Sequence, residues 1–397
     1  MNFDKSDSQN ELAGLVREIV TSRAAGEGGD GFDRTLWHEL GKAGVLSAAL
    51  PESLGGAGLG LLEQCSVLTE LGRAVAPAPY LASIVLGASA IAAFGTPEQQ
   101  RRWAEPAGRG ELVLTAALEG PVMDTLGAGV VGTGVMAAPW ADAFLVPAGA
   151  DVFIVERSDA GVTVEPQEHT DGVTAGRVVL DDAVFDGDGL SDDRVLPGGE
   201  EVARWLMRRG TVGLCALQLG VTERALELTA EYARNRVQFA RPIGSFQAVS
   251  QRLADAWIDV EAIRLTLWQA AWRLSEGLPA DVEIATAKFW AADAGHRVAH
   301  TAVHIHGGVG IDSSYILQRY FAAAKHNEFA LGGATSQLRR IGAELAKALH
   351  RTKIIYSAFP AAASELRSPR VDSSQPPASP TTGNIILHMG TICLLPG

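Results

Sequence analysis

Residues 232–255 read YARNRVQFARPIGSFQAVSQRLAD and join two segments that have helical periodicity. Within it, residues 234–243 gather three basic side chains, Arg234, Arg236 and Arg241, around the aromatic Phe239 and a proline that defines a turn. A guanidinium group suits phosphates because it donates paired hydrogen bonds, and an aromatic face suits a stacked ring. The residues therefore predict either a solvated loop or an anion-binding corner, and both interpretations stay open.

The helical pattern extends to both sides of this stretch. Small or apolar residues recur at helical spacing at Ile284, Ala287, Ala291, Ala294, Val298, Ala302 and Ile305. Long segments of this kind predict a helical bundle after Leu196, and the pair Gly307-Gly308 is expected to end one helix in the left-handed conformation. Residues 11–110 are also helical in pattern, and Thr96 followed by Pro97 predicts the start of a helix.

The residue pattern between residues 112 and 192 differs from that of the segments on either side. Short runs rich in Val, Leu and Phe, such as AFLVPA, DVFIVER, GVTVEP and GRVVLDDAVF, alternate with Gly, Asp and Pro. This spacing predicts a small antiparallel β domain. A GxGxxG pattern at 127–132 is followed by β-prone residues instead of a helix, so a β-hairpin is a better interpretation than a dinucleotide-binding fold.

Composition limits the classes of function. The 397 residues are 47% hydrophobic and 20% charged, which is typical of folded globular proteins. The 33 Lys and Arg against 46 Asp and Glu give a net charge of −13, which argues against a nucleic-acid partner. The N-terminus has no apolar leader and the longest apolar stretch is too short to span a bilayer, so neither secretion nor a membrane span is expected.

Metal and disulfide chemistry receive no support from the spacing of ligand residues. Cys65, Cys215 and Cys393 are far apart and have no CxxC spacing, which favours a reducing, cytoplasmic setting. His304 and His306 are two residues apart on a helix and so face different sides, which favours capping or packing over a metal site. The segment 351–397 is rich in Pro and Ser over most of its length and is expected to be a disordered tail.

Two blocks carry a family resemblance. Residues 232–255 are similar to the flavin-contacting stretch of acyl-CoA dehydrogenases, whose pattern is R-x-Q-F-G-x-P-I followed by F-Q and L-A-D. Residues 303–342, VHIHGGVGIDSSYILQRYFAAAKHNEFALGGATSQLRRIG, resemble the Q-x-H-G-G-x-G and E-G-T-x-Q region of the same family. The resemblance implies an α+β fold: an N-terminal helical domain (1–111), a middle antiparallel β domain (112–196), a C-terminal four-helix bundle (197–350) and a tail (351–397).

The resemblance also implies FAD as the cofactor and a set of residues that contact it. Arg236, Gln238, Phe239 and Gln247 would contact FAD from one protomer. Because the family shares its flavin across a subunit interface, the neighbouring protomer would contribute His304, Gly307, Gly308, Thr335 and Gln337. An acyl thioester of CoA or of acyl-carrier protein would be the substrate, and an electron-transfer flavoprotein would accept the electrons.

Two departures from the family pattern concern the chemistry. The catalytic glutamate of E-G-T aligns with Gly333, and the alternative base position, on the helix before R-x-Q-F, aligns with Gly210. Glycine cannot carry a proton, so the catalytic residue is unknown, and Glu328 and Glu201 are only the nearest acids in sequence. In the loop where the family has T-E-P-x-x-G-S-D, Leu118 replaces the threonine.

Three functions therefore stay open. The chain resembles actinobacterial members that act on steroid side chains as two-chain heterotetramers, and the leading hypothesis is an FAD-dependent acyl-CoA dehydrogenase that needs a partner or a relocated base. The first alternative is a catalytically silent subunit that completes the flavin site of an active paralogue. The second is another flavin oxidation on the same fold. The expected assembly is a homo- or heterotetramer, and Arg208, Arg209 and Arg241 are candidate ligands for the phosphates of CoA.

Overall fold

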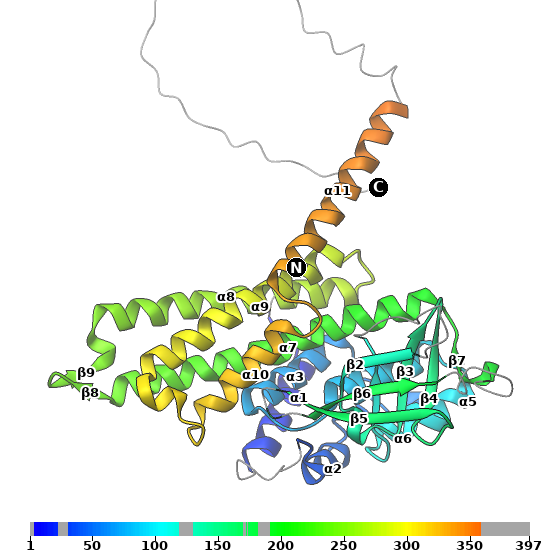
Figure 1. Ribbon diagram of the computed structural model, residues 1–397, viewed down its shortest axis with the longest axis horizontal. Helices are drawn as coiled ribbons and strands as arrows, with labels where there is room; N and C mark the ends of the chain where they lie inside the picture. The colour runs from blue at the N-terminus through cyan, green and yellow to red at the C-terminus, as the bar shows by residue number, and fades with distance from the viewer. Residues whose placement is uncertain are drawn as a thin grey trace, which may run out of the picture. The chain divides into compact units, whose positions relative to one another are not determined.

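The computed structural model describes residues 4–22, 31–118, 130–169, 172, 174–181 and 191–358. The chain divides into a first unit, residues 1–346, and a second unit, residues 347–397. Within the first unit, helices come first, strands follow and long helices come last (Figure 1). The second unit contains the end of helix α11 (Ala334–Ala358), and residues 359–397 lie outside the described part of the chain. Helix α11 thus enters the segment expected to be a tail.

The N-terminal region is helical, as its periodicity predicts. Its helices are α1 (Asp7–Thr21), α2 (Arg34–Lys42), α3 (Leu61–Ala74), α4 (Ser89–Phe94), α5 (Pro97–Gln99) and α6 (Glu105–Gly108), with π-helical turns at Leu81–Ala88 and Gln100–Ala104. The predicted helix start at Thr96 is confirmed, because the Thr96 hydroxyl accepts from the Gln99 N–H and the Gln99 side chain accepts from the Thr96 N–H. Cys65 and Cys215 are buried free thiols, and burial raises the pKa of both.

The middle region forms two sheets, shown in cyan to green in Figure 1. The strands are β1 (Leu114–Ala116), β2 (Val130–Met136), β3 (Ala143–Ala148), β4 (Asp151–Glu156), β5 (Val162–Glu168), β6 (Thr174–Leu180) and β7 (Val195–Leu196). One sheet has the order β1-β3-β4-β7 and the other β2-β6-β5. Pairing is antiparallel as expected, except that β1 lies parallel to β3.

The GxGxxG pattern ends in a strand. Val130–Met136 is β2, which excludes the helix that a dinucleotide-binding motif requires, while residues 127–129 lie outside the described part. The predicted hairpin is not seen among the described residues, where β2 pairs with β6, far along the chain, and not with β3. A short-range pattern signals a strand but carries no information about a distant partner.

The C-terminal part of the first unit is a helical bundle. It contains α7 (Glu200–Asn235), α8 (Gln247–Ser275), α9 (Asp281–His306) and α10 (Leu317–Phe329), and both α7 and α9 contact the other three helices. A tight turn with the short strands β8 (Val237–Gln238) and β9 (Arg241–Pro242) joins α7 to α8. In the described part of the chain, no helix has the length and apolarity that a bilayer span requires.

Helices α3 and α7 cross at very close range, and glycines permit this approach. A Cβ atom on Gly72 would overlap the main-chain oxygen of Leu217, and one on Gly220 would overlap the main-chain oxygen of Thr69. The crossing lies beside the main apolar core, which joins the N-terminal helices, the β1 sheet and the bundle. The reciprocal pair of glycines therefore sets the position of α7 relative to the N-terminal helices.

Candidate flavin site

The turn between α7 and α8 presents polar and aromatic groups to the exterior. Arg236, Gln238 and Phe239 are exposed, with Phe239 reaching 89% of its full accessibility. Phe239 and Ala240 both have positive φ angles, 51° and 62°, in the left-handed region that non-glycine residues rarely occupy. The two short strands hold this strained tip in place. In the described part of the chain, the Arg236 guanidinium makes no ion pair, so it remains available to an anion.

The C-terminal end of α9 lies beside this turn. The Tyr232 ring stacks on the His306 ring with centroids 4.3 Å apart, and its hydroxyl donates to the His306 main-chain oxygen at 3.4 Å. His304 is exposed, whereas His306 is buried and its pKa is lowered by burial. The helix ends at His306, as predicted, but Gly307 has φ 64° and ψ −138°, which is a glycine conformation outside the left-handed helical region expected.

Most of the cofactor residues expected from the family pattern lie at this one end of the bundle. They are Arg236, Gln238, Phe239, Gln247, His304, Gly307 and Gly308. A Cβ atom on Gly307 or Gly308 would meet no atom of the chain within 4 Å, so the backbone there is open to a ligand. The donors, the aromatic ring and the open backbone together suit the pyrophosphate and adenine of FAD.

Thr335 and Gln337 lie elsewhere, at the N-terminal end of α11. Thr335 is exposed, and Gln337 is buried with its Nε2 donating to the main-chain oxygens of Leu331 at 3.1 Å and Gly332 at 2.9 Å. With a helical rise of about 1.5 Å per residue, α7 spans about 37 Å from Gly210, which neighbours Leu331, to its end at the turn. The two groups of expected cofactor residues therefore lie near opposite ends of this part of α7 within one chain.

The departures from the family pattern converge in space. A Cβ atom on Gly210 would lie 2.9 Å from Leu118 Cδ1, 3.4 Å from Leu86 Cδ2 and 3.6 Å from Leu331 Cδ1. We call these three side chains around Gly210 the leucine cluster. A Cβ atom on Gly333, two residues after Leu331, would lie 3.6 Å from the main-chain oxygen of Glu328. Apolar side chains thus surround Gly210, one of the two positions where the family pattern places a proton acceptor.

The nearest acids in sequence, Glu328 and Glu201, lie outside the leucine cluster. The Glu328 carboxylate accepts from Lys325 Nζ at 2.5 Å and lies 3.1 Å from His296 Nδ1. Lys288, which is fully buried, donates to the Glu328 main-chain oxygen and so fixes the end of α10. Glu201 is exposed in the first turn of α7. Both carboxylates are therefore engaged or remote from the leucine cluster.

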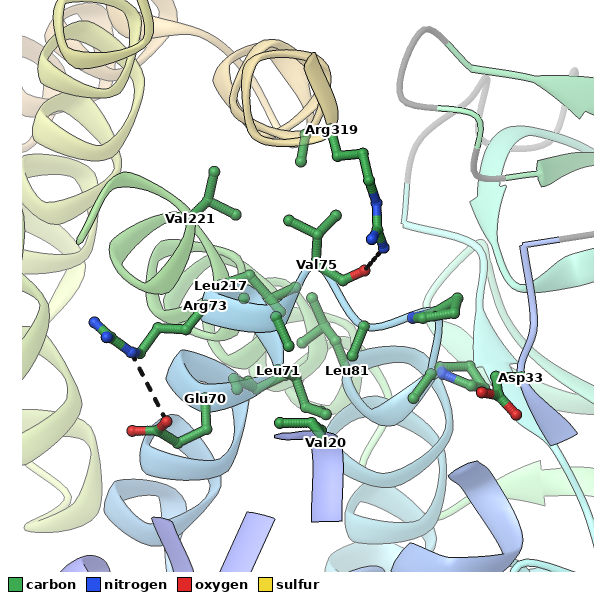
Figure 2. A pocket seen from close by; sticks show the side chains of 18 of the residues that line it. Val20, Asp33, Glu70, Leu71, Arg73, Val75, Leu81, Leu217, Val221 and Arg319 are labelled. Atoms are coloured by element: carbon green, nitrogen blue, oxygen red, sulfur yellow. Dashed lines mark hydrogen bonds and ion pairs between the residues drawn. The ribbon is translucent and has the colours of Figure 1, made fainter. Parts of the chain in front are cut away.

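Two cavities lie between the helices and the β sheets. The larger has a volume of about 670 Å³ (Figure 2) and the smaller about 380 Å³. Met136, Leu214 and His326 line both, which makes the cavities neighbours. Leu118 and Leu331 of the leucine cluster line the smaller one.

Sequence reasoning missed two histidines in the smaller cavity. His169 follows β5 and His326 lies on α10, and their Nδ1 atoms are 3.1 Å apart. One imidazole must donate its proton to the other in this contact. No sequence signal could have paired them, because they are far apart in the chain and belong to no motif.

Two of the three arginines considered for CoA phosphates are engaged within the chain. Arg208 makes two hydrogen bonds of 2.7 Å to the carboxylate of Asp281. Arg209 lies over the ring of Trp205, and burial lowers its pKa to about 10. Arg241 is exposed and rests on the ring of Phe246. Only Arg241 among the three presents its guanidinium to the exterior without an acidic partner in the described residues.

Comparisons with known proteins agree with this architecture. Family models match residues 6–111 as "Acyl-CoA dehydrogenase, N-terminal domain" and residues 198–346 as "Acyl-CoA dehydrogenase, C-terminal domain". The chain is 50% identical to acyl-CoA dehydrogenase FadE27 of Mycobacterium tuberculosis, over 87% of this chain and 99% of that protein. It belongs to the acyl-CoA dehydrogenase family. Members of this family are flavin oxidoreductases that use FAD.

Solved structures of other acyl-CoA dehydrogenases have the same fold. A chain of the ChsE4–ChsE5 complex from Mycobacterium tuberculosis is 50% identical and superimposes with a TM-score of 0.81, covering 87% of this chain and 99% of that one. A chain of the Tcur3481–Tcur3483 steroid acyl-CoA dehydrogenase is 37% identical, with a TM-score of 0.77 and the same 87% and 99% coverage. Both structures contain two different chains by name. The fold expected from the sequence, with helices, β domain and C-terminal helices in that order, is therefore confirmed.

The residues of this acyl-CoA dehydrogenase fit FAD unevenly. The turn at Arg236 and the open backbone at Gly307 fit the phosphates and adenine, as described above. Near Gly210, Gln337 donates its side-chain N–H groups to main-chain oxygens of the same chain. The Leu118 side chain cannot donate a hydrogen bond to a flavin ring. The chemistry of the residues at the turn thus suits the phosphates and adenine of FAD better than that of Gln337 and Leu118 suits the flavin ring.

Proposed function

We propose that this chain is a subunit of a heteromeric FAD-dependent acyl-CoA dehydrogenase. In this assembly it supplies the phosphate- and adenine-binding end of a flavin site. The flavin ring and the catalytic base belong to a partner chain of different sequence. The observation that carries the proposal is the leucine cluster around Gly210, together with the glycine at the other base position, Gly333.

The need for a different partner follows from the missing base. Desaturation of an acyl thioester requires removal of an α-proton while the β-hydride passes to the flavin. An assembly of this chain alone would have Gly210 and Gly333 at every base position, and none could accept the proton. The names of the two heteromeric relatives support an assembly of two chain types. The second of these names supports a steroid-linked acyl thioester as substrate.

Each residue at the turn has a physical role in the proposed site. Arg236 binds the pyrophosphate with charge-assisted hydrogen bonds, and Phe239 offers its exposed ring to stack on the adenine. The backbone at Gly307 and Gly308 allows close approach of the dinucleotide. Bound FAD supplies the acceptor for the hydride, and an electron-transfer flavoprotein in the cytoplasm would reoxidise it.

The flavin content of purified protein tests the proposal. The chain produced alone is expected to be colourless, and the chain co-produced with its paralogue is expected to carry about one FAD per two chains. The ratio follows from the absorbance at the flavin maximum divided by the protein concentration. Loss of this absorbance on addition of an acyl-CoA shows that the substrate reduces the flavin. One FAD per chain in the protein produced alone, bleached by acyl-CoA, would contradict the proposal.

A glutamate introduced at the family's base position in this chain is not expected to raise the rate of acyl-CoA dehydrogenation. In the complex, Gly333→Glu should leave the rate of acyl-CoA dehydrogenation within about twofold, since the new carboxylate faces no flavin ring in this chain. The matched control is glutamate→glutamine at the equivalent position of the partner, which should lower the rate by about 10²- to 10⁴-fold. The number of active sites in the Gly333→Glu complex can be measured by titrating the flavin that acyl-CoA reduces. A twofold rise would show that this chain forms a second catalytic site, and would contradict the proposal that only the partner chain carries the base.

A further inference from the structure

Two half-buried histidines meet at the smaller cavity, one from the end of β5 and one from helix α10. The Nδ1 atoms of His169 and His326 are 3.1 Å apart, their ring centroids are 4.8 Å apart and their ring planes make an angle of 33°. A straight N–H···N bond of this length would place the two centroids about 5.4 Å apart, because each nitrogen lies outward of its ring centre. The observed rings are closer, so a hydrogen bond between them is bent.

The same two distances match a pair of imidazoles that share one metal ion. With Zn–N distances of about 2.0–2.1 Å and an N–Zn–N angle of about 90–110°, the nitrogens lie about 2.9–3.4 Å apart and the ring centroids about 4.5–5.2 Å apart. The 3.1 Å and 4.8 Å separations of this pair both fall within these ranges. Neutral imidazole is a common ligand of zinc, copper and nickel ions. The histidine pair therefore has the spacing of a two-nitrogen chelate.

The elements that carry the two histidines are held in place independently. Gln167 accepts from the Gly134 N–H at 2.8 Å, which ties the end of β5, just before His169, to β2. On α10, the fully buried ammonium of Lys288 donates to the main-chain oxygens of the two residues that follow His326. Both backbones are thus fixed by contacts outside the pair. A site placed on such fixed elements needs little rearrangement to bind an ion.

The other side chains that line the smaller cavity are compatible with a cation. Glu168 adds a carboxylate to the lining, and the ammonium of Lys325 is paired with the Glu328 carboxylate at 2.5 Å. Among the residues that the structure describes, no set of three or more His, Cys, Asp or Glu side chains is placed to hold a metal ion. The described chain therefore supplies two ligands. The cavity volume of about 380 Å³ leaves space for water at the remaining coordination positions.

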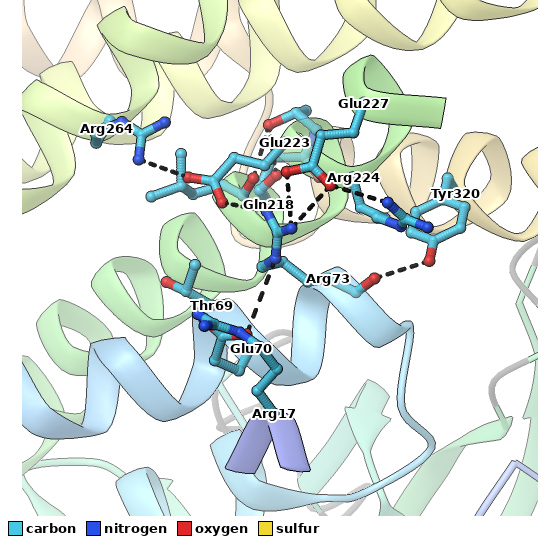
Figure 3. A network of polar contacts seen from close by, with 12 residues as sticks. Arg17, Thr69, Glu70, Arg73, Gln218, Glu223, Arg224, Glu227, Arg264 and Tyr320 are labelled. Carbon is cyan, nitrogen blue, oxygen red and sulfur yellow. Dashed lines mark hydrogen bonds and ion pairs between the residues drawn. The ribbon is translucent and has the colours of Figure 1, made fainter. Parts of the chain in front are cut away.

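A second cluster of polar side chains, between α1, α3 and α7, is internally balanced. Glu70 accepts from Arg17 at 2.6 Å, and Arg73 pairs with Glu223 at 2.8 Å and with Glu227 at 2.7 Å (Figure 3). Each of these carboxylates is engaged by an arginine, so a metal ion would have to displace a salt bridge to reach it. The histidine pair imposes no such cost, because imidazole nitrogens are neutral ligands.

We propose that the Nδ1 atoms of His169 and His326 bind one zinc ion, with water at its remaining coordination positions. Both imidazoles are then neutral and carry their hydrogen on Nε2, so protons compete with the ion as the pH falls. The ion links the β2-β6-β5 sheet to α10 and should stabilise the folded chain. This site goes beyond the proposed contribution to the flavin site, because it uses none of the residues assigned to FAD.

Calorimetric titration with zinc tests the proposal. The sample is the full-length protein with its co-purifying partner and FAD, freed of metal ions by dialysis against a chelator. His169→Ala and His326→Ala should each weaken zinc binding by at least about 10-fold, because one nitrogen ligand is lost. His38→Ala, which removes an exposed histidine from α2, is the matched control and should bind zinc like the unaltered protein. No saturable zinc binding, or binding that neither His169→Ala nor His326→Ala weakens, would overturn the proposal.

Two further measurements identify the ligands and exclude a simple hydrogen bond. Divalent copper, which binds imidazole sites more tightly than zinc, should give a paramagnetic resonance spectrum with splitting from two nitrogens, and one nitrogen should disappear in His169→Ala. Zinc should raise the thermal midpoint of the unaltered complex and of His38→Ala but not that of the two cavity variants. A midpoint that the cavity variants lower equally with and without zinc would show that the rings share only a hydrogen bond.

The flavin content separates this inference from the proposed flavin role. The amount of FAD per complex should be the same with and without zinc and in each histidine variant, since the pair lies outside the residues assigned to FAD. Zinc binding at the pair can therefore be confirmed or overturned whether or not the chain contributes to a flavin site. Circular dichroism confirms that each variant is folded.

Discussion

Arg236→Ala is expected to weaken FAD binding by the assembled enzyme by about 10- to 100-fold, because charge-assisted hydrogen bonds to phosphate are lost. The Arg236 side chain is exposed and makes no ion pair with the described residues. Its removal should therefore change the free energy of unfolding much less than it changes the affinity for FAD. FAD affinity can be measured from the quenching of flavin fluorescence as apo-complex is titrated. Activity at low FAD concentration should fall in parallel and recover when FAD is added in excess.

Two further variants distinguish a phosphate contact from a general effect of charge. Arg236→Lys keeps the positive charge but loses the planar fork, and it should restore only part of the affinity. Arg101→Ala removes an equally exposed arginine that pairs with Glu98 on the N-terminal helices, and it should bind FAD normally. If Arg236→Ala binds FAD as tightly as Arg101→Ala, the turn between α7 and α8 is not part of a flavin site.

Gly220→Val is expected to destabilise the chain by at least about 3 kcal/mol, or to prevent its accumulation as soluble protein. A Cβ atom there would overlap the main-chain oxygen of Thr69 and lie 2.6 Å from the main-chain nitrogen of Arg73. Backbone atoms cannot move aside as a flexible side chain can, so α3 and α7 would have to separate. The midpoint of urea unfolding, followed by circular dichroism, measures the loss.

Gly14→Ala is the matched control for this crossing. Gly14 lies in helix α1, and a Cβ atom added there would meet nothing within 4 Å. Alanine at this position should raise stability by roughly 0.5–1 kcal/mol, because it lowers the conformational entropy of the unfolded chain. A Gly220→Val protein that unfolds at the same urea concentration as the Gly14→Ala protein would show that the close crossing does not exist.

Local patterns were sufficient for much of the fold. The helix start at Thr96, the end of α9 at His306 and the strands within residues 143–180 follow from capping, glycine and alternation of apolar residues over a few positions. The turn around Arg236 was recognisable for the same reason, since its arginines, aromatic and proline are adjacent in the chain. The two glycines at the base positions were also visible in the sequence, although their surroundings were not.

Distant pairings required the tertiary structure. The partner of β2 is β6, and the histidine pair joins His169 to His326, neither of which leaves a local signal. The family pattern implied that Thr335, Gln337 and His304 of one protomer contact the same FAD. In the structure, much of the length of α7 separates Thr335 and Gln337 from His304 within one chain. A rigid helix fixes such distances only once the register of the whole bundle is known.

By itself, the sequence determined that this is a helical protein with a β domain in its middle, a turn at Arg236 rich in arginine and aromatic side chains, and no acid at Gly210 or Gly333. These are properties of single positions and short segments, where backbone preferences and side-chain chemistry act locally. Only the tertiary structure decided that Leu86, Leu118 and Leu331 close around Gly210, and that His169 meets His326 at the smaller cavity. Such features depend on packing between segments far apart in the chain, which a local pattern does not encode.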